Sequence, residues 1–82
     1  MTPRERLNAV SEYSLQFSKN TNKLRNAKFM SIDALRRAVG LSHGNIHRIV
    51  HGQTEIPLKS AVLICNYFDK NLIEMVYEDV KV

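Results

Sequence analysis

The chain has 82 residues, 44% of them hydrophobic, and a formal net charge of +4 at pH 7. This length and composition predict one small folded domain and exclude an intrinsically disordered chain. No apolar run reaches the roughly 18 residues that a membrane span needs, and the charged start MTPRERLNAV is unlike a secretory signal. A lone cysteine, Cys65, leaves no partner for an internal disulfide, so we expect a cytoplasmic protein.

Positive charge gathers in one segment of the chain. Residues 19–59 hold eight lysines or arginines and two acids, whereas residues 60–82 hold two lysines and four acids. A surface with such an excess of basic side chains attracts phosphates. We therefore expect residues 19–59 to carry the face that meets nucleic acid.

The first predicted helix begins at Thr2, an N-cap, with Pro3 in the first helical position. Apolar residues follow at helical spacing, at Leu7, Val10 and Phe17. Residues 18–22 are mostly poor helix formers, so the helix either ends there or continues to Ala27. We assign residues 1–16 to an N-terminal helical extension of the domain.

Two short helices joined by a tight turn are predicted within residues 31–52, SIDALRRAVGLSHGNIHRIVHG. Ser31 is the N-cap of the first helix, and Gly40 ends it with a positive φ. Ser42 caps the second helix, which ends at Gly52. This is the plan of a helix-turn-helix, in which the second helix enters the major groove of DNA.

Two further helices are predicted after a polar loop at residues 53–55. The first follows Pro57 and is apolar on most sides, which is typical of a central core helix. The second is capped by Asn71 and runs to about Tyr77, and residues 78–82 then fray or form a short strand. The predicted fold is all-α, a compact bundle of about five helices, with the helix-turn-helix domain at residues 17–77 and a tail at residues 78–82.

Residues of matching type recur at Phe17, Leu35, Gly40-Leu41-Ser42, Ile46, Arg48-Ile49, Gly52, Pro57-Leu58, Ile64-Cys65, Phe68 and Asn71 to Met75. In this register residues 17–76 resemble the lambda-repressor-like (Xre-type) helix-turn-helix family. The shorter motif is also similar to the headpiece of the LacI family, where it opens the chain. The resemblance implies a domain that binds double-stranded DNA. Arg36 departs from it, because the family has a small residue at this point of contact between the two motif helices.

The second motif helix carries the predicted base contacts. With 3.6 residues per turn, Ile46 and Ile49 face inward, and the outward residues are Ser42, His43, Gly44, His47 and Arg48. The resemblance places base contacts at the last four of these. Arg48 is the strongest candidate because a guanidinium binds guanine O6 and N7 together, which is worth ~1–3 kcal/mol of discrimination. Gly44 either lets a base come close or is merely tolerated.

Contacts to DNA phosphates are predicted on both sides of this helix. Ser31 and the free amides after it form one candidate clamp. The other candidates are Arg36, Arg37, Asn45, Gln53, Thr54 and Lys59. Such contacts position a protein on DNA without reading its sequence. The alternative for each basic side chain is that it is simply solvated.

Metal binding and catalysis are not predicted. His43, His47 and His51 are spaced four apart, and two histidines at this spacing can share a metal ion. No acid or cysteine stands nearby in the sequence to complete such a site. No nucleophile has a catalytic motif around it, so we expect no metal, no cofactor and no enzymatic activity.

The predicted function is that of a transcriptional regulator, a repressor or autoregulator from a bacterium, phage or mobile element. We expect a homodimer on a pseudo-palindromic operator, paired through Leu72, Ile73 and Val76 of the last helix. The first helix is the alternative pairing surface. The alternative function is an antitoxin or anti-repressor that uses the same fold to bind a protein partner.

Overall fold

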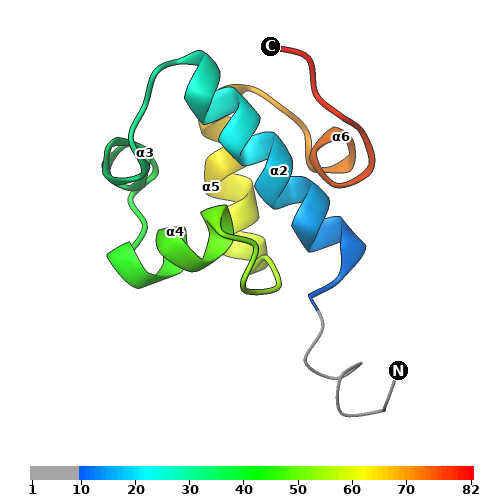
Figure 1. Cartoon of the computed structure of the whole chain (residues 1–82), viewed down its shortest axis with the longest axis horizontal. Helices are drawn as coiled ribbons and strands as arrows, with labels where there is room; N and C mark the ends of the chain where they lie inside the picture. The colour runs from blue at the N-terminus through cyan, green and yellow to red at the C-terminus, as the bar shows by residue number, and fades with distance from the viewer. Residues whose placement is uncertain (1–9) are drawn as a thin grey trace.

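The computed structural model describes residues 10–82, so the predicted cap at Thr2-Pro3 and the residue Leu7 lie outside the described part. Five helices follow one another within this part: α2 (Glu12–Ala27), α3 (Ile32–Val39), α4 (His43–Val50), α5 (Leu58–Phe68) and α6 (Leu72–Tyr77). Residues 10–82 contain no strand. In Figure 1, α3 and α4 lie on one side of α2 and α5, and α6 lies on the other. The prediction of an all-α bundle with a helix-turn-helix is confirmed.

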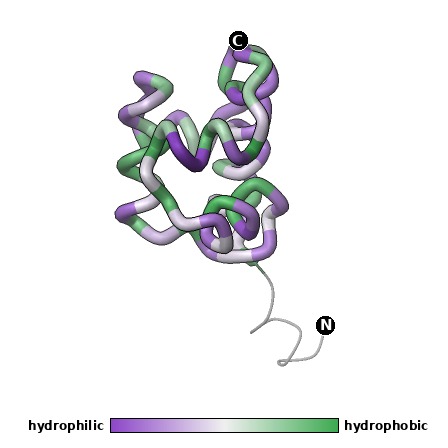
Figure 2. Tube along the Cα trace, turned by 90° about the vertical axis from the view of Figure 1, so that its left-hand side faces the viewer, coloured by the Kyte–Doolittle hydropathy of each residue, from purple (hydrophilic) through white to green (hydrophobic). Residues whose placement is uncertain are grey.

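One hydrophobic core joins all five helices. Its fully buried apolar side chains are Phe17, Leu35, Ile46, Ile49, Ile64 and Met75. Hydrophilic and hydrophobic residues alternate along the helices in Figure 2, as amphipathic helices require. Helices of six to eleven residues, such as α3 to α6, are marginal in isolation. Packing against this shared core therefore holds them in place.

Helix α2 passes through the polar segment without a break and ends at Ala27. The sequence did not decide whether the helix ends at residues 18–22 or continues to Ala27. The domain boundary predicted after residue 16 falls inside this helix. Ser18 and Thr21 are buried, and each donates a hydrogen bond, Ser18 Oγ to the Ile49 carbonyl at 2.6 Å and Thr21 Oγ1 to the Phe17 carbonyl at 2.8 Å. Buried polar groups are tolerated when they are paired in this way.

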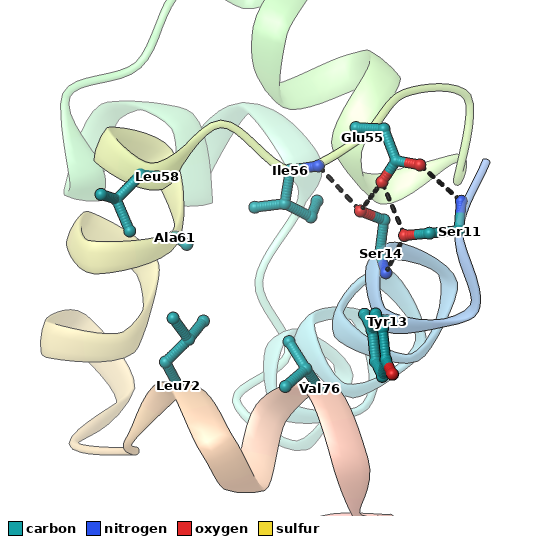
Figure 3. A pocket seen from close by; sticks show the side chains of 9 residues that line it. All are labelled: Ser11, Tyr13, Ser14, Glu55, Ile56, Leu58, Ala61, Leu72 and Val76. Carbon is teal, nitrogen blue, oxygen red and sulfur yellow. Dashed lines mark hydrogen bonds between the residues drawn. The ribbon is translucent and has the colours of Figure 1, made fainter.

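The loop after α4 is attached to the start of α2 by Glu55 (Figure 3). Its carboxylate accepts hydrogen bonds from the Ser11 N–H at 2.6 Å, from Ser11 Oγ at 2.6 Å and from Ser14 Oγ at 2.5 Å. Ser14 Oγ in turn accepts a hydrogen bond from the Ile56 N–H at 2.9 Å. The hydrogen bonds from Ser11 and Ser14 lower the pKa of Glu55. Glu55, one of two acids in the basic segment of residues 19–59, therefore has a structural role.

Replacing Glu55 by glutamine is expected to lower the free energy of unfolding at pH 7. A carboxylate whose pKa is lowered by folding stabilises the fold above the unfolded-state pKa, and that contribution disappears as the pH falls through the folded-state pKa. The difference between wild type and Glu55→Gln should therefore be smaller at about pH 4 than at pH 7, because the unfolded chain already binds protons near the ordinary glutamate pKa of about 4.3. Urea unfolding at the two pH values measures it, with Glu78→Gln as the control. An equal difference at both pH values would contradict this role.

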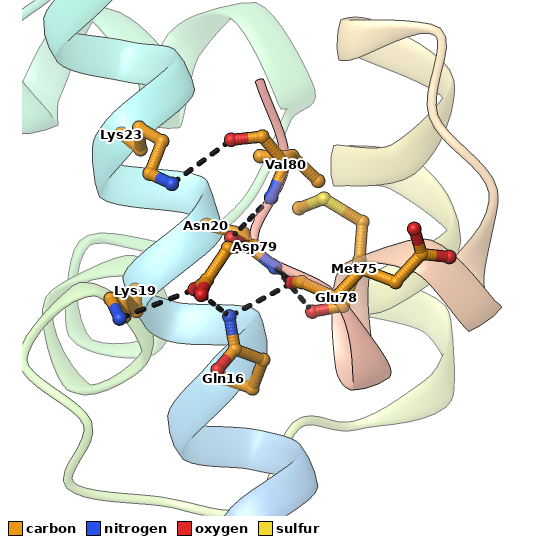
Figure 4. Close-up of polar contacts among 8 residues, drawn as sticks. All are labelled: Gln16, Lys19, Asn20, Lys23, Met75, Glu78, Asp79 and Val80. Carbon is orange, nitrogen blue, oxygen red and sulfur yellow. Dashed lines mark hydrogen bonds and ion pairs between the residues drawn. The ribbon is translucent and has the colours of Figure 1, made fainter. Parts of the chain in front are cut away.

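The C-terminal tail neither frays nor forms a strand, so this expectation was wrong. Residues 78–80 lie against α2, and the Val80 side chain is buried (Figure 4). Asn20 Nδ2 donates to the carbonyls of Met75 at 2.9 Å and Glu78 at 2.6 Å, and the Val80 N–H donates to Asn20 Oδ1 at 3.1 Å. One buried asparagine thereby pairs one backbone group of α6 and two of the tail. This is why the chain stays ordered beyond α6.

Cationic side chains of α2 hold the outside of the same tail. Lys23 Nζ donates to the Val80 carbonyl at 2.9 Å, and Lys19 Nζ lies 3.2 Å from Asp79 Oδ1. Gln16 Nε2 donates to Asp79 Oδ1 at 3.0 Å, and this bond together with Lys19 lowers the pKa of Asp79. Lys19 and Lys23 of α2 are therefore both engaged by the tail.

Candidate DNA-binding face

The turn between α3 and α4 forms as the sequence predicts. Gly40 adopts φ 75° and its N–H donates to the Arg36 carbonyl at 2.9 Å. Leu41 is buried beneath the turn. Ser42 Oγ accepts a hydrogen bond from the Asn45 N–H at 3.3 Å and so caps α4. The predicted positive φ and the predicted cap are both confirmed.

Helix α4 has one buried and one exposed face. Ile46 and Ile49 are 0% and 1% exposed, and Val50 is buried beside them. The exposed residues are Ser42, His43, Gly44, Asn45, His47 and Arg48. All five predicted base-contact residues therefore lie on the surface.

Side chains of α2 fix the C-terminal end of α4. Ser18 Oγ donates to the Ile49 carbonyl, and Asn22 Nδ2 donates to the Val50 carbonyl at 2.6 Å. These donors pair carbonyls that a helix end leaves without partners. Sequence reasoning missed both contacts, because the partners are about thirty residues apart. These hydrogen bonds fix the end of α4 relative to α2 and thus the direction of its exposed face.

Arg48 lies along the exposed face of α4. Its Nη2 donates to Asn45 Oδ1 at 2.9 Å. A Cβ atom built on Gly44 would lie 3.6 Å from Arg48 Nη1, which is an ordinary contact distance. The Arg48 guanidinium therefore lies beside the position that a side chain at residue 44 would occupy. Asn45, predicted as a phosphate contact, holds the Arg48 side chain in this structure.

The three histidines stand in a row along α4. The ring centroids of His43 and His47 are 5.2 Å apart, and those of His47 and His51 are 4.6 Å apart. His51 is the C-cap residue, so the row extends past the last helical turn. Across residues 10–82 no three side chains of histidine, cysteine, aspartate or glutamate come together as metal ligands.

The basic residues of α3 are paired with an acid on their own helix. Arg36 Nε lies 2.9 Å from Asp33 Oδ1, and Arg37 Nε lies 3.2 Å from Asp33 Oδ2. The hydrogen bond from Arg36 is the main cause that lowers the pKa of Asp33. Arg36 is half-buried, and its Nε reaches the more exposed Asp33 carboxylate. Ser31 Oγ accepts from the Ala34 N–H at 3.0 Å and caps α3 as predicted.

The loop after α4 presents the remaining predicted phosphate contacts. Gln53 and Lys59 are exposed, whereas Thr54 is half-buried and donates to the Glu55 carbonyl at 3.2 Å. Gly52, with φ 65°, turns the chain into this loop. The Glu55 contacts with Ser11 and Ser14 hold the loop against α2.

An apolar groove of about 260 Å³ lies between the start of α2, the start of α5 and α6 (Figure 3). Its lining includes Leu72 and Val76, two of the three residues predicted to form the dimer interface. Leu58 at its rim is 70% exposed, and the third predicted residue, Ile73, is 63% exposed. Tyr13 of α2 and Tyr77 of α6 pair edge to face with ring centroids 5.2 Å apart.

A family model of the Cro/C1-type HTH DNA-binding domain matches residues 20–76. The chain belongs to this family. The predicted resemblance to the lambda-repressor-like proteins is therefore confirmed over almost the same residues. Cro/C1-type domains form a DNA-binding regulator family and not an enzyme family. No curated protein and no solved structure matches the chain.

The matched residues include α3 and α4, the two helices joined by the turn at Gly40. Helix α2 begins before the matched residues and the docked tail follows them. None of the described helices is both long enough and apolar enough to cross a membrane.

Proposed function

We propose that this Cro/C1-type protein is a sequence-specific transcriptional regulator, a repressor or autoregulator, that places α4 in the major groove. The observation that carries this proposal is the two-sided construction of α4, with its isoleucines in the core and its polar residues exposed. The proposed base contacts are Ser42, His43, Gly44, His47 and Arg48. We assign the protein to the bacterial cytoplasm. Its gene would belong to the bacterium, to a phage or to a mobile element.

Phosphate contacts are proposed on either side of α4. The residues are Ser31, Arg36, Arg37, Asn45, Gln53, Thr54 and Lys59. Arg36 and Arg37 share Asp33, so in DNA-bound protein one of them exchanges part of this pairing for a phosphate. The sum of such contacts makes DNA affinity depend steeply on salt concentration.

Selection of bound sequences from random duplexes tests the proposed function. A symmetric dimer should recover an inverted repeat whose half-sites are about one DNA turn, roughly 34 Å, apart. Recovery of no preferred sequence, together with weak binding that all duplexes share, would overturn sequence-specific regulation.

Dimerisation through α6 is the second part of the proposal. Leu72 and Val76 line an apolar groove, and Ile73 beside them is exposed, which is typical of a surface that meets another protein. Two copies related by a two-fold axis would bury this surface and present two α4 helices to one duplex.

Replacing Ile73 by aspartate is expected to convert the dimer to a monomer without unfolding it. The residue is 63% exposed, so the new charge stays in water in the monomer but would be buried in the pair. We expect at least a tenfold weaker dimer, which corresponds to about 1.4 kcal/mol. Sedimentation equilibrium measures it. Phe29→Asp, at a 97% exposed position in the α2–α3 loop, is the control and should stay dimeric. Unchanged dimerisation of Ile73→Asp would exclude α6 as the interface.

The same groove also favours the alternative function, an antitoxin or anti-repressor whose main ligand is a protein. In that case a defined partner should protect Leu58 and Leu72 from solvent, and DNA binding should be too weak to measure. Hydrogen exchange of the purified complex, compared with that of the free protein, separates the two functions.

A further inference from the structure

Every histidine of this chain lies in one row along α4 and its C-cap. The sequence has three histidines, and they are His43, His47 and His51. All three are exposed, and their rings follow one another at 5.2 Å and 4.6 Å between centroids. The proposed base contacts include His43 and His47 as hydrogen-bonding groups. They give no role to His51 or to the charge that the row of three histidines would carry when protonated.

The groups around the row leave a positive charge on it uncompensated. None of the ion pairs in the described part of the chain involves a histidine. Asp33 of α3 is near His43, and its carboxylate is shared between Arg36 and Arg37. Arg48 is the cation on the same face of α4.

The other elements that meet α4 add no free acid to the row. Helix α2 touches the end of α4 through neutral Ser18 and Asn22. The cations of α2 are bound elsewhere, Lys19 to Asp79, Lys23 to the Val80 carbonyl and Arg25 to the Met30 carbonyl. In the following loop, the Glu55 carboxylate is bound by Ser11 and Ser14.

Protonated imidazoles about 5 Å apart repel one another, whereas nearby phosphates favour the protonated form. We propose that the row of His43, His47 and His51 lies against DNA in its protonated form, with His51 at a phosphate, so that the protein takes up protons when it binds DNA and its affinity rises as the pH falls. This inference rests on the proposed function. It adds His51 to the binding surface and makes acidification a signal that strengthens binding.

Between about pH 6 and pH 8, histidine is the side chain whose ordinary pKa falls in the range. An ordinary histidine is half-protonated near pH 6.5, and the α-amino group titrates near pH 8. Burial raises the pKa of Cys65, so its thiol stays protonated in this range. The pKa values of Asp33, Glu55 and Asp79 are lowered, so these carboxylates titrate in more acidic solution.

The test is the affinity for a fluorescein-labelled duplex of on the order of 24 base pairs, a little over two turns. Anisotropy titrations from about pH 6 to pH 8 are run at constant ionic strength on the full chain. Uptake of one proton strengthens binding up to tenfold per pH unit, so we expect at least about a tenfold gain over this range. The slope of log affinity against log salt should also steepen, by ~0.9 for each added phosphate contact.

Histidine variants assign the effect to the row. The triple variant His43→Gln, His47→Gln, His51→Gln should lose the pH dependence, each variant being compared with its own affinity near pH 8. His51→Gln alone should lose part of it. Lys81→Gln removes one charge away from α4 and should keep the wild-type pH dependence.

The outcomes separate this inference from the proposed function. Wild-type binding that is equally tight at both ends of the range, or pH dependence that persists in the triple variant, overturns the inference and leaves the function standing. Failure to bind any duplex at any pH overturns the function itself. Should the triple variant not fold, NMR titration of the wild-type imidazoles decides. Imidazole titration midpoints that move to higher pH when the duplex is added support the proposal. Midpoints that do not move refute it.

Discussion

Replacing Ile46 by aspartate is expected to unfold the domain. Ile46 has no exposed surface and lies in the core where α4 packs against the rest of the bundle. The variant would bury a carboxylate with no partner, at a cost of roughly 4 kcal/mol or more. At about 0.05–0.15 kcal/mol per residue, a domain of this size has a total stability of roughly 4–12 kcal/mol, so such a loss unfolds the domain or leaves it marginal. Far-UV circular dichroism and urea unfolding measure the loss.

Ile73→Asp is the matched control for this experiment. It makes the same chemical change at an isoleucine that is 63% exposed, and it should keep the helical spectrum and a cooperative transition. A soluble Ile46→Asp variant that unfolds cooperatively near the wild-type midpoint would contradict the inward orientation of α4.

Replacing Asn20 by alanine is expected to destabilise the protein by roughly 2–4 kcal/mol. The truncation removes the partner of the Met75 carbonyl and of the Val80 N–H, and it leaves the Glu78 carbonyl with Gln16 Nε2 as its donor. Urea unfolding gives the free energy, and amide hydrogen exchange at Val80 shows whether the tail has detached. The loss should be larger than any single surface substitution produces.

Asn66→Ala serves as the control, because Asn66 is exposed on α5. Its effect should stay within about 0.5 kcal/mol of wild type. An equally small effect of Asn20→Ala would show that the tail is held by Val80 packing alone.

Local signals made the centre of the fold predictable. Gly40 and Ser42 act within a few residues of their own positions, and the inward spacing of Ile46 and Ile49 follows from one helical period. The cap at Asn71 is confirmed as well, because its side chain and that of Glu74 pair reciprocally with the backbone. Features of this kind need no knowledge of the tertiary structure.

Long-range polar contacts were not predictable. Poor helix formers at residues 18–22 left the course of α2 open, because their partners lie in other elements. Asn20 reaches backbone groups 55 to 60 residues away, and Glu55 reaches Ser11 and Ser14 more than 40 residues away. No local pattern indicates such pairs, so the sequence predicted only a polar loop after α4 and a tail that frays or forms a short strand.

The candidate site also has features that the sequence predicted and features that it did not. Helical periodicity was sufficient to place His43, His47 and Arg48 on the exposed face of α4. It did not predict that Asn45 holds Arg48 or that Asp33 pairs with both Arg36 and Arg37. These contacts depend on side-chain conformations that a sequence pattern does not specify.

The most direct test of the central claim is the ratio of affinities for a selected operator and for mixed-sequence DNA, measured for wild type and Arg48→Ala. The account predicts that Arg48→Ala weakens operator binding by ~1–3 kcal/mol, about 5- to 150-fold, and leaves mixed-sequence binding nearly unchanged. Arg37→Ala, a proposed phosphate contact, should instead weaken both equally. An equal loss on both DNAs for Arg48→Ala would contradict the claim that the exposed face of α4 reads base sequence.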